Sequence, residues 1–164
     1  PYNLNRLELR ICDLVTNPIA LLAIIALLEA RLMQMLADPS LDPLQQSQLS
    51  PTELLTLTDA NEVAAAQQSL DATLLHWQDG HPLLARDWIR ELYETVYPLA
   101  KQQGFSCFLS PLKSILRQGN TAQQWLGQYE MGLSLGQILE QAILGLETEE
   151  ASLEDYLCQA WGVA

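Results

Sequence analysis

The sequence predicts a mostly α-helical chain that carries one β-strand near its N-terminus. Apolar and polar residues alternate from Arg6 to Cys12, which is the period of a strand with one buried face. Six or seven later segments show helical spacing of apolar residues, most of them after a capping residue. A lone strand is unstable without neighbours, and no later segment alternates clearly enough to pair with it. We therefore expect its partner strands upstream, in a larger protein; the alternatives are residues 105–109 or a second copy of the chain.

The first helix is predicted over residues 18–37, with Asn17 as N-cap and Pro18 at the first helical position. At about 1.5 Å per residue this helix is roughly 30 Å long, enough to cross a bilayer. Glu29 and Arg31 interrupt its apolar run, which leaves too short a stretch for a membrane span. We expect a central helix that is buried on most sides.

The next elements follow from prolines and caps. Residues 38–50 are predicted to form a loop. Ser50 and Glu53 form a capping box for the next helix. This helix is expected to restart near Thr58 or Asp59 and to end at about Trp77. Its predicted apolar stripe consists of Val63, Ala66, Leu70, Leu74 and Trp77.

A turn at residues 79–82 leads into a helix from about Leu84 to Gln103, with a kink at Pro98 and a stop at Gly104. Residues 105–109 form a short apolar segment, extended or irregular. Four shorter helices follow, which start near Ser110, Asn120, Ser134 and Ser152 and end near Gly119, Gly132, Leu146 and Ala160.

Composition limits the possible functions. The chain has 164 residues, which suits one ordinary domain, and its net charge of −12 disfavours binding to nucleic acids or anionic membranes. Cys12, Cys107 and Cys158 form no CxxC pair, so we expect reduced thiols without a disulfide framework or zinc site. No basic region followed by an apolar stretch marks a signal peptide, and we expect a cytoplasmic protein.

Glu8 and Arg10 are the strongest candidates for chemistry. Two residues apart on a strand, they point to the same side, about 7 Å apart. The carboxylate can hold a hard divalent cation, and the guanidinium can clamp a phosphate or a carboxylate. The alternative is a solvated sheet face whose charges pair across strands.

The segment "LELRICD" at residues 7–13, followed by an apolar helix, resembles the Glu-Leu-Arg-Val/Ile-Cys-Asp segment of the bacterial and plant-type glutamate–cysteine ligase family, which includes carboxylate–amine ligases. The resemblance continues in "TDANEVAAAQQSLDATLLHW" at 58–77, in the helix at 85–103, and in "GFSCFLSPLKSILRQGNTAQQWL" at 104–126. These segments look like the cyanobacterial-type branch, and they correspond to the C-terminal half of a family member.

The resemblance implies an α+β, glutamine-synthetase-like catalytic fold in the full protein. Residues 1–164 would then be the C-terminal portion of a single catalytic domain, with 1–16 in the catalytic sheet and 17–164 as its helical part. Family members hold ATP and Mg²⁺ on the concave face of that sheet. They join the γ-carboxylate of glutamate to the amine of cysteine through γ-glutamyl phosphate, the first step of glutathione biosynthesis.

In this family Glu8 matches the strand glutamate expected to bind the metal, and Arg10 matches the arginine expected near the transferred phosphate or the substrate carboxylate. Asp13 also matches the family segment, although ending the strand is its simpler role. We expect the isolated chain to be inactive, because most metal ligands and the remaining sheet would lie upstream. The alternatives are a non-catalytic helical protein-interaction module and a related ligase with another amine substrate.

Other polar residues have simpler explanations. Asn61 is expected on a solvated helix face, and Ser69 stands where many relatives carry Gly. Arg86, Arg90 and Glu94 follow one another at helical-turn spacing, which predicts a surface ladder of charges.

His76 and His81 are five residues apart across a turn that contains a glycine, and this spacing supports neither a metal-ligand pair nor a catalytic triad. Asn120 and Thr121 are explained by ordinary helix capping.

Overall fold

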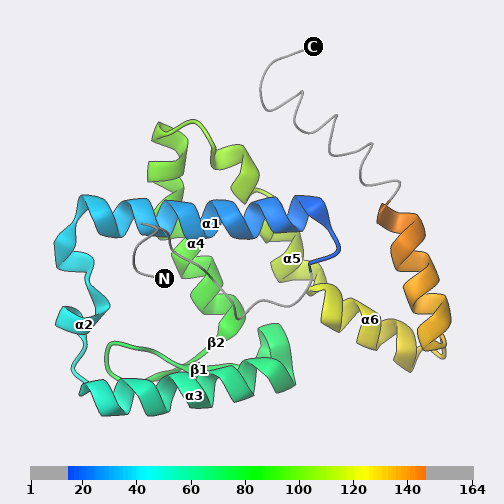
Figure 1. Ribbon diagram of the computed structural model, residues 1–164, viewed down its shortest axis with the longest axis horizontal. Coiled ribbons are helices and arrows are strands. Elements are labelled where there is room, and N and C mark those ends of the chain that lie inside the picture. Colours follow the sequence, from blue (N-terminus) through cyan, green and yellow to red (C-terminus); the bar gives the residue numbers. More distant parts are fainter. Residues whose placement is uncertain (1–14, 147–164) are drawn as a thin grey trace, which may run out of the picture.

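The computed structural model describes residues 15–146, which are mostly helical with one small antiparallel sheet (Figure 1). The predicted helical character is confirmed, whereas the strand expected at residues 6–12 and the helix expected from Ser152 lie outside the described residues. The elements are α1 Pro18–Ala37, η2 Pro39–Leu41, α2 Pro43–Gln46, α3 Pro51–Gln68, η3 Ser69–Asp71, β1 Thr73–Leu75, β2 Pro82–Leu84, α4 Ala85–Gln102, η4 Ser106–Leu109, α5 Leu112–Gln118, α6 Thr121–Glu130 and a helix at Leu135–Leu146.

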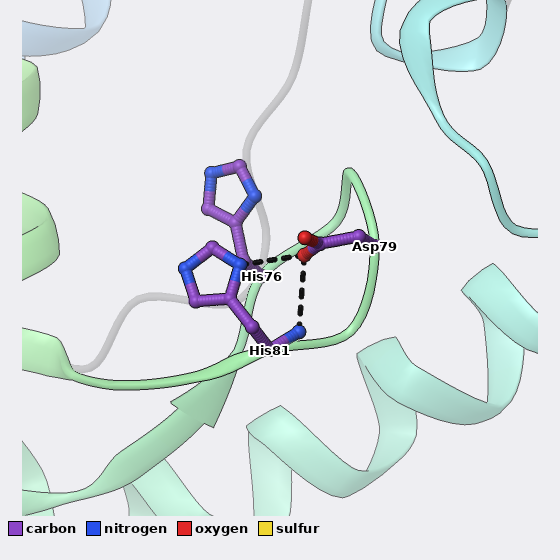
Figure 2. Close-up of side chains that lie close together, drawn as sticks. All are labelled: His76, Asp79 and His81. Carbon is purple, nitrogen blue, oxygen red and sulfur yellow. Dashed lines mark hydrogen bonds and ion pairs between the residues drawn. The ribbon is translucent and has the colours of Figure 1, made fainter.

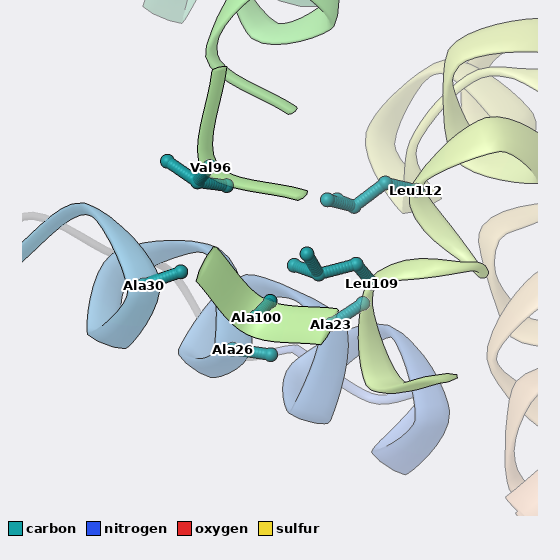
Figure 3. Packing of buried hydrophobic residues seen from close by; sticks show 7 residues of the cluster. All are labelled: Ala23, Ala26, Ala30, Val96, Ala100, Leu109 and Leu112. Atoms are coloured by element: carbon teal, nitrogen blue, oxygen red, sulfur yellow. The ribbon is translucent and has the colours of Figure 1, made fainter. Parts of the chain in front are cut away.

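The main core forms where α1 crosses α4 (Figures 1 and 3). Small side chains on one face of α1 let the two helices approach closely, and leucines from η4 and α5 close the side of the contact. Asn17 starts α1 as predicted, because its side chain accepts a hydrogen bond of 2.7 Å from the Ala20 amide. The buried cluster consists of Ala23, Ala26, Ala30, Val96, Ala100, Leu109 and Leu112.

The expectation that α1 is buried on most sides is wrong for the described part of the chain. Only its alanine face is buried, while Ile25 is 47% exposed and Leu36 is 82% exposed. Length and composition alone would let α1 cross a membrane, a weak criterion that core helices and signal sequences also meet. The apolar sequence of α1 therefore did not establish that the helix is buried on all sides. Only one stripe of small residues on α1 makes the contact with α4.

The helix predicted to continue to Trp77 ends at Gln68, without a break at Thr58 or Asp59. Ser69 follows with φ 56° and ψ −128°, and the chain then forms a two-stranded hairpin in which Thr73 pairs with Leu84 and Leu75 with Pro82. The predicted stripe on α3 is also wrong. The hairpin packs against the helix face that carries buried Leu57 and, one turn later, Asn61, while Val63 is exposed.

The rest of the chain keeps the predicted order. α4 runs from the hairpin to α1 and ends just before Gly104, whose φ of 85° suits a glycine after a helix (Figure 1). Residues 106–109 form the turn of 3₁₀ helix η4, so the alternative in which residues 105–109 pair with the N-terminal strand is wrong. Asn120 caps α6 through a capping box with Gln123, as the sequence predicts.

Candidate functional site

Glu8, Arg10 and Asp13 lie outside the described residues, so their predicted roles stay predictions. The described chain begins close to them in sequence, at Val15, and Thr16 and Asn17 already line a cavity. The cavity is therefore the described feature nearest in sequence to the predicted site.

This polar cavity has a volume of about 170 Å³ and lies between the start of α1, the helix α6 and the helix at Leu135–Leu146. Its polar lining consists of side-chain amides and hydroxyls, and the Oε1 atom of Gln128 is buried there without a hydrogen-bond partner among the described residues. Such an atom can accept a hydrogen bond from a water molecule or a ligand. The lining residues are Thr16, Asn17, Thr121, Gln124, Trp125, Gln128, Ile138, Gln141, Ala142 and Gly145.

The described lining of this cavity does not fit a magnesium ion. Mg²⁺ is bound through carboxylate oxygens and phosphates, and the described lining contains neither Asp nor Glu. Any protein carboxylate for Mg²⁺ must come from elsewhere in the protein, and we derive no reaction step through the metal.

A second group of functional side chains gathers at the turn between β1 and β2. His76 and His81 stand opposite each other at the base of the turn, because the His76 amide donates to the His81 carbonyl at 2.8 Å. Their rings are stacked, with centroids 5.0 Å apart and planes at 21°. Asp79 completes the group: its Oδ1 lies 2.5 Å from Nδ1 of His81. The structure thus brings together two histidines and an aspartate whose spacing in the sequence supported neither a ligand pair nor a triad.

Figure 2 shows both imidazole rings presenting a nitrogen toward the Asp79 carboxylate. One potential ligand atom from each of the three side chains lies within 4.8 Å of the other two, and in residues 15–146 this is the single such group of His, Cys, Asp or Glu. The sequence signal for Asp79 was the Asp79-Gly80 pair, a hairpin-turn dipeptide between the apolar segments that became β1 and β2. Gly80 has φ 79°, which a residue with a side chain rarely adopts.

The electrostatics of the turn favour a neutral imidazole beside a carboxylate. Burial lowers the pKa of His76, and the nearby His81 lowers it further, while Asp79 and Glu91 oppose the shift. Hydrogen bonds from the backbone and then the side chain of His81 lower the pKa of Asp79. The ring of Trp88 lies 5.0 Å from that of His76 and covers it on another side.

The backbone of this turn is fastened by neighbouring elements. Asn61 of α3 makes two hydrogen bonds to Leu75, donating to its carbonyl at 2.8 Å and accepting from its amide at 2.7 Å. The hydroxyl of Ser47 donates to the Trp77 carbonyl at 2.7 Å, and the Gln48 amide donates to the Gln78 carbonyl at 2.7 Å. Asn61 was expected on a solvated helix face, but instead it holds the hairpin.

The predicted surface ladder of Arg86, Arg90 and Glu94 is also wrong. Arg86 contacts Asp71 and donates to the Leu116 carbonyl at 2.9 Å, so it ties the hairpin region to α5. Arg90 pairs with Asp87 at 2.8 Å. Both arginines therefore have structural partners within the described residues, and neither lines the polar cavity.

Ser69 is the position at which the sequence resemblance leads us to expect Gly. Its positive φ of 56° is the reason that glycine suits this position. The Ser69 hydroxyl accepts a hydrogen bond from the side chain of Asn120, the cap of α6.

Comparisons with known proteins agree with the resemblance noted in the sequence. A family model described as glutamate-cysteine ligase family 2 matches residues 1–150. A curated protein of Leifsonia xyli subsp. xyli (strain CTCB07), named "Putative glutamate--cysteine ligase 2", is 30% identical over 142 residues. This alignment covers 87% of the chain but 35% of that protein, so the chain spans about a third of its relative's length. No solved structure matches the chain significantly.

Proposed function

This chain belongs to glutamate-cysteine ligase family 2, and on that basis we propose that it forms the C-terminal portion of an ATP-dependent enzyme that joins glutamate to cysteine. The observation that carries the proposal is the family match over residues 1–150, which includes Glu8 and Arg10 as well as the helices around the polar cavity. The name of the relative supports cysteine as the amine substrate.

In the proposed reaction an oxygen of the glutamate γ-carboxylate attacks the γ-phosphorus of ATP and displaces ADP. The amine of cysteine then attacks the carbonyl carbon of γ-glutamyl phosphate, an amide bond forms, and phosphate leaves with the former carboxylate oxygen. Arg10 would neutralise charge on the phosphoryl oxygens during the first step, because a guanidinium can hold two such oxygens at once. An enclosed site would keep the acyl phosphate from water.

Members of this family use ATP and Mg²⁺, and we propose Glu8 as a metal ligand in this protein. A carboxylate is the side chain that a hard cation prefers, whereas the described cavity lining offers none. The remaining ligands and the sheet that pairs with residues 6–12 are proposed to come from other parts of the same enzyme. We also propose a cytoplasmic location, where thiols such as that of cysteine stay reduced.

The polar cavity is proposed to lie at the edge of the same site. Thr16, which lines the cavity, lies four residues after the strand predicted at residues 6–12. The uncharged amide lining suits hydrogen bonding to the neutral polar groups of a substrate or to ordered water. The unpartnered Oε1 of Gln128 is one acceptor available for that purpose.

The experiment measures formation of γ-glutamylcysteine by the complete protein with ATP, glutamate and cysteine at increasing Mg²⁺. We expect Glu8→Gln to lower turnover by about 10²-fold and to raise the Mg²⁺ requirement, because it removes one metal ligand. Glu62→Gln, an exposed change on α3, is the matched control and should leave both unchanged.

Near-normal turnover of Glu8→Gln at saturating Mg²⁺ would contradict the metal role of Glu8. If the complete wild-type protein forms amide products faster with another amine, the activity is that of a related carboxylate–amine ligase. Absence of any ATP-dependent product would instead favour the non-catalytic interaction module.

A further inference from the structure

We propose that the turn at residues 76–81 binds a divalent transition-metal ion, with Zn²⁺ as the reference ion, through His76, Asp79 and His81. This site does not depend on the ligase activity proposed above, and it shares no residue with Glu8, Arg10 or the polar cavity. The proposal starts from the side-chain cluster in Figure 2.

The first argument is the spacing of the ligand atoms. Tetrahedral Zn²⁺ with ligands at about 2.0–2.2 Å requires ligand atoms roughly 3.3 Å apart. The three potential ligand atoms of this cluster all lie within 4.8 Å of one another, and the shortest separation is 2.5 Å, between Asp79 Oδ1 and His81 Nδ1. Shifts of about 1 Å in the positions of the ligand atoms would bring these separations close to the tetrahedral value.

The second argument is that the backbone already holds the three side chains together. The amide of His76 bonds the carbonyl of His81, and the amide of Gly80 bonds the carbonyl of His76, each at 2.8 Å. Asn61 and Ser47 fasten the turn from outside, as described above. These four bonds do not use the side chains of the cluster, so they hold the turn together with the bond from the His81 amide to Asp79 Oδ1 at 3.1 Å, and the site is preorganised.

The third argument is the chemistry of the donors. Two imidazoles and one carboxylate suit Zn²⁺ and its neighbours in the first transition row, whereas Mg²⁺ and Ca²⁺ prefer oxygen ligands alone. A metal binds the neutral form of an imidazole, through a ring nitrogen. Metal binding at its Nδ1 would replace one hydrogen bond, which that atom accepts from the Gln78 amide at 3.2 Å.

The fourth argument is access. The side chain of His81 is 53% exposed and that of Asp79 is 42% exposed, so an ion can enter from solvent and keep a water molecule as its fourth ligand. The ring of Trp88 lies 5.0 Å from that of His76. A metal bound here would link the two ends of the turn and stabilise the hairpin by mass action.

The experiment is a calorimetric titration of the complete protein with Zn²⁺ alone, in saturating Mg²⁺ so that a hard-cation site is filled. We expect one Zn²⁺ per chain. His76→Ala and His81→Ala should each weaken binding at least about tenfold, and Asp79→Asn should weaken it as well. Asp87→Asn is the matched control, because Asp87 is a similarly exposed aspartate at 43% that pairs only with Arg90 among the described ion pairs. It should bind Zn²⁺ like the wild type.

A second readout locates the ion. Trp77 and Trp88 lie 5.1 and 5.0 Å from the ring of His76, so Cu²⁺ bound at the turn should quench tryptophan fluorescence. The double variant His76→Ala/His81→Ala should lose this quenching while its helical circular dichroism stays unchanged. If a histidine variant fails to fold, Asp79→Asn, which preserves the side-chain shape, decides the question. Wild-type Zn²⁺ affinity in the folded double variant, or no Zn²⁺ binding by the wild type, would overturn the proposal.

Discussion

The two ends of α4 are held in place by different kinds of interaction. At its C-terminal end, Val96 and Ala100 pack against the alanine face of α1, and the contact contains no buried polar side chain. At its N-terminal end, the hairpin is fastened by hydrogen bonds from Asn61 and Ser47 to the backbone of the turn. The core end depends on close packing, whereas the hairpin end depends on individual polar bonds around the turn that carries His76, Asp79 and His81.

This difference has a consequence for what each end can do. The core end consists of closely packed apolar side chains, which support the fold. The hairpin end leaves the side chains of His81 and Asp79 about half exposed, at 53% and 42%, and further bonds from Asn61 and Ser47 hold the turn. Substitutions at the two ends should therefore differ in size and in the property that they change.

The largest effect is expected in the packed core. Leu109→Ala removes a fully buried side chain that contacts α1 and α4, and we expect it to lower the free energy of unfolding by about 3 kcal/mol. Urea unfolding measures this change. Leu44→Ala, at a side chain that is 74% exposed, should change it by less than about 0.5 kcal/mol. Equal effects of the two variants would show that the described core does not stabilise the protein.

The next effect concerns the polar fastening of the hairpin. Asn61→Ala leaves the amide and the carbonyl of Leu75 without their partners, and we expect it to cost about 2 kcal/mol. Asn61→Asp keeps an acceptor for the Leu75 amide and loses the donor. The exposed change Asp59→Ala on the same helix is the control for helix propensity. A cost for Asn61→Ala no larger than that of Asp59→Ala would mean that the hairpin is held by other contacts.

A smaller effect is expected at Ser69, which joins α3 to the hairpin. In a helix, Gly is about 0.5–1 kcal/mol less stabilising than Ala. At φ 56° and ψ −128° this order should reverse. We expect the free energy of unfolding of Ser69→Gly to be about 1 kcal/mol higher than that of Ser69→Ala. Both variants lose the hydrogen bond from Asn120, so this loss cancels in the comparison. The usual order, with Ala more stable, would contradict the backbone conformation of Ser69.

The smallest effect is a pH dependence of the hairpin end. The pKa of His76 in the folded protein is lower than its ordinary value of 6.5, which applies in the unfolded chain. At a pH between the folded and the unfolded pKa, the unfolded chain therefore binds more protons than the folded protein. The contribution of His76 to stability is present above about pH 6.5 and is lost as the pH falls from there through the folded pKa. Comparing the unfolding free energies of wild type and His76→Gln over this range isolates it. A stability difference that is independent of pH would contradict the shift.

The sequence predicted the helix starts better than the helix ends. Asn17, Ser50 and Asn120 begin α1, α3 and α6 as expected, because a cap is a local interaction between neighbouring residues. The end of α3 was missed because Leu74 and Trp77 also fit helical spacing. The hairpin that replaces the last turns depends on pairing with residues 82–84, which periodicity in one segment does not reveal.

The candidate sites differ in the same way. The family could be identified from residues 7–13 together with the segments at 58–77, 85–103 and 104–126, because each is contiguous in sequence. The cluster of His76, Asp79 and His81 could not be inferred from the spacing of the two histidines alone, since their contact depends on the hairpin register and on Gly80. The role of Asn61 was missed because a polar residue on a helix is usually solvated.

The proposed ligase reaction is tested most directly by following one oxygen atom. The complete protein is incubated with ATP, cysteine and glutamate that carries ¹⁸O in its γ-carboxylate, and the released phosphate is analysed by mass spectrometry. The account predicts that phosphate released with each amide product carries one ¹⁸O atom, because the carboxylate oxygen leaves with the phosphoryl group. Amide formation with unlabelled phosphate, or ATP cleavage that does not require glutamate, would contradict it.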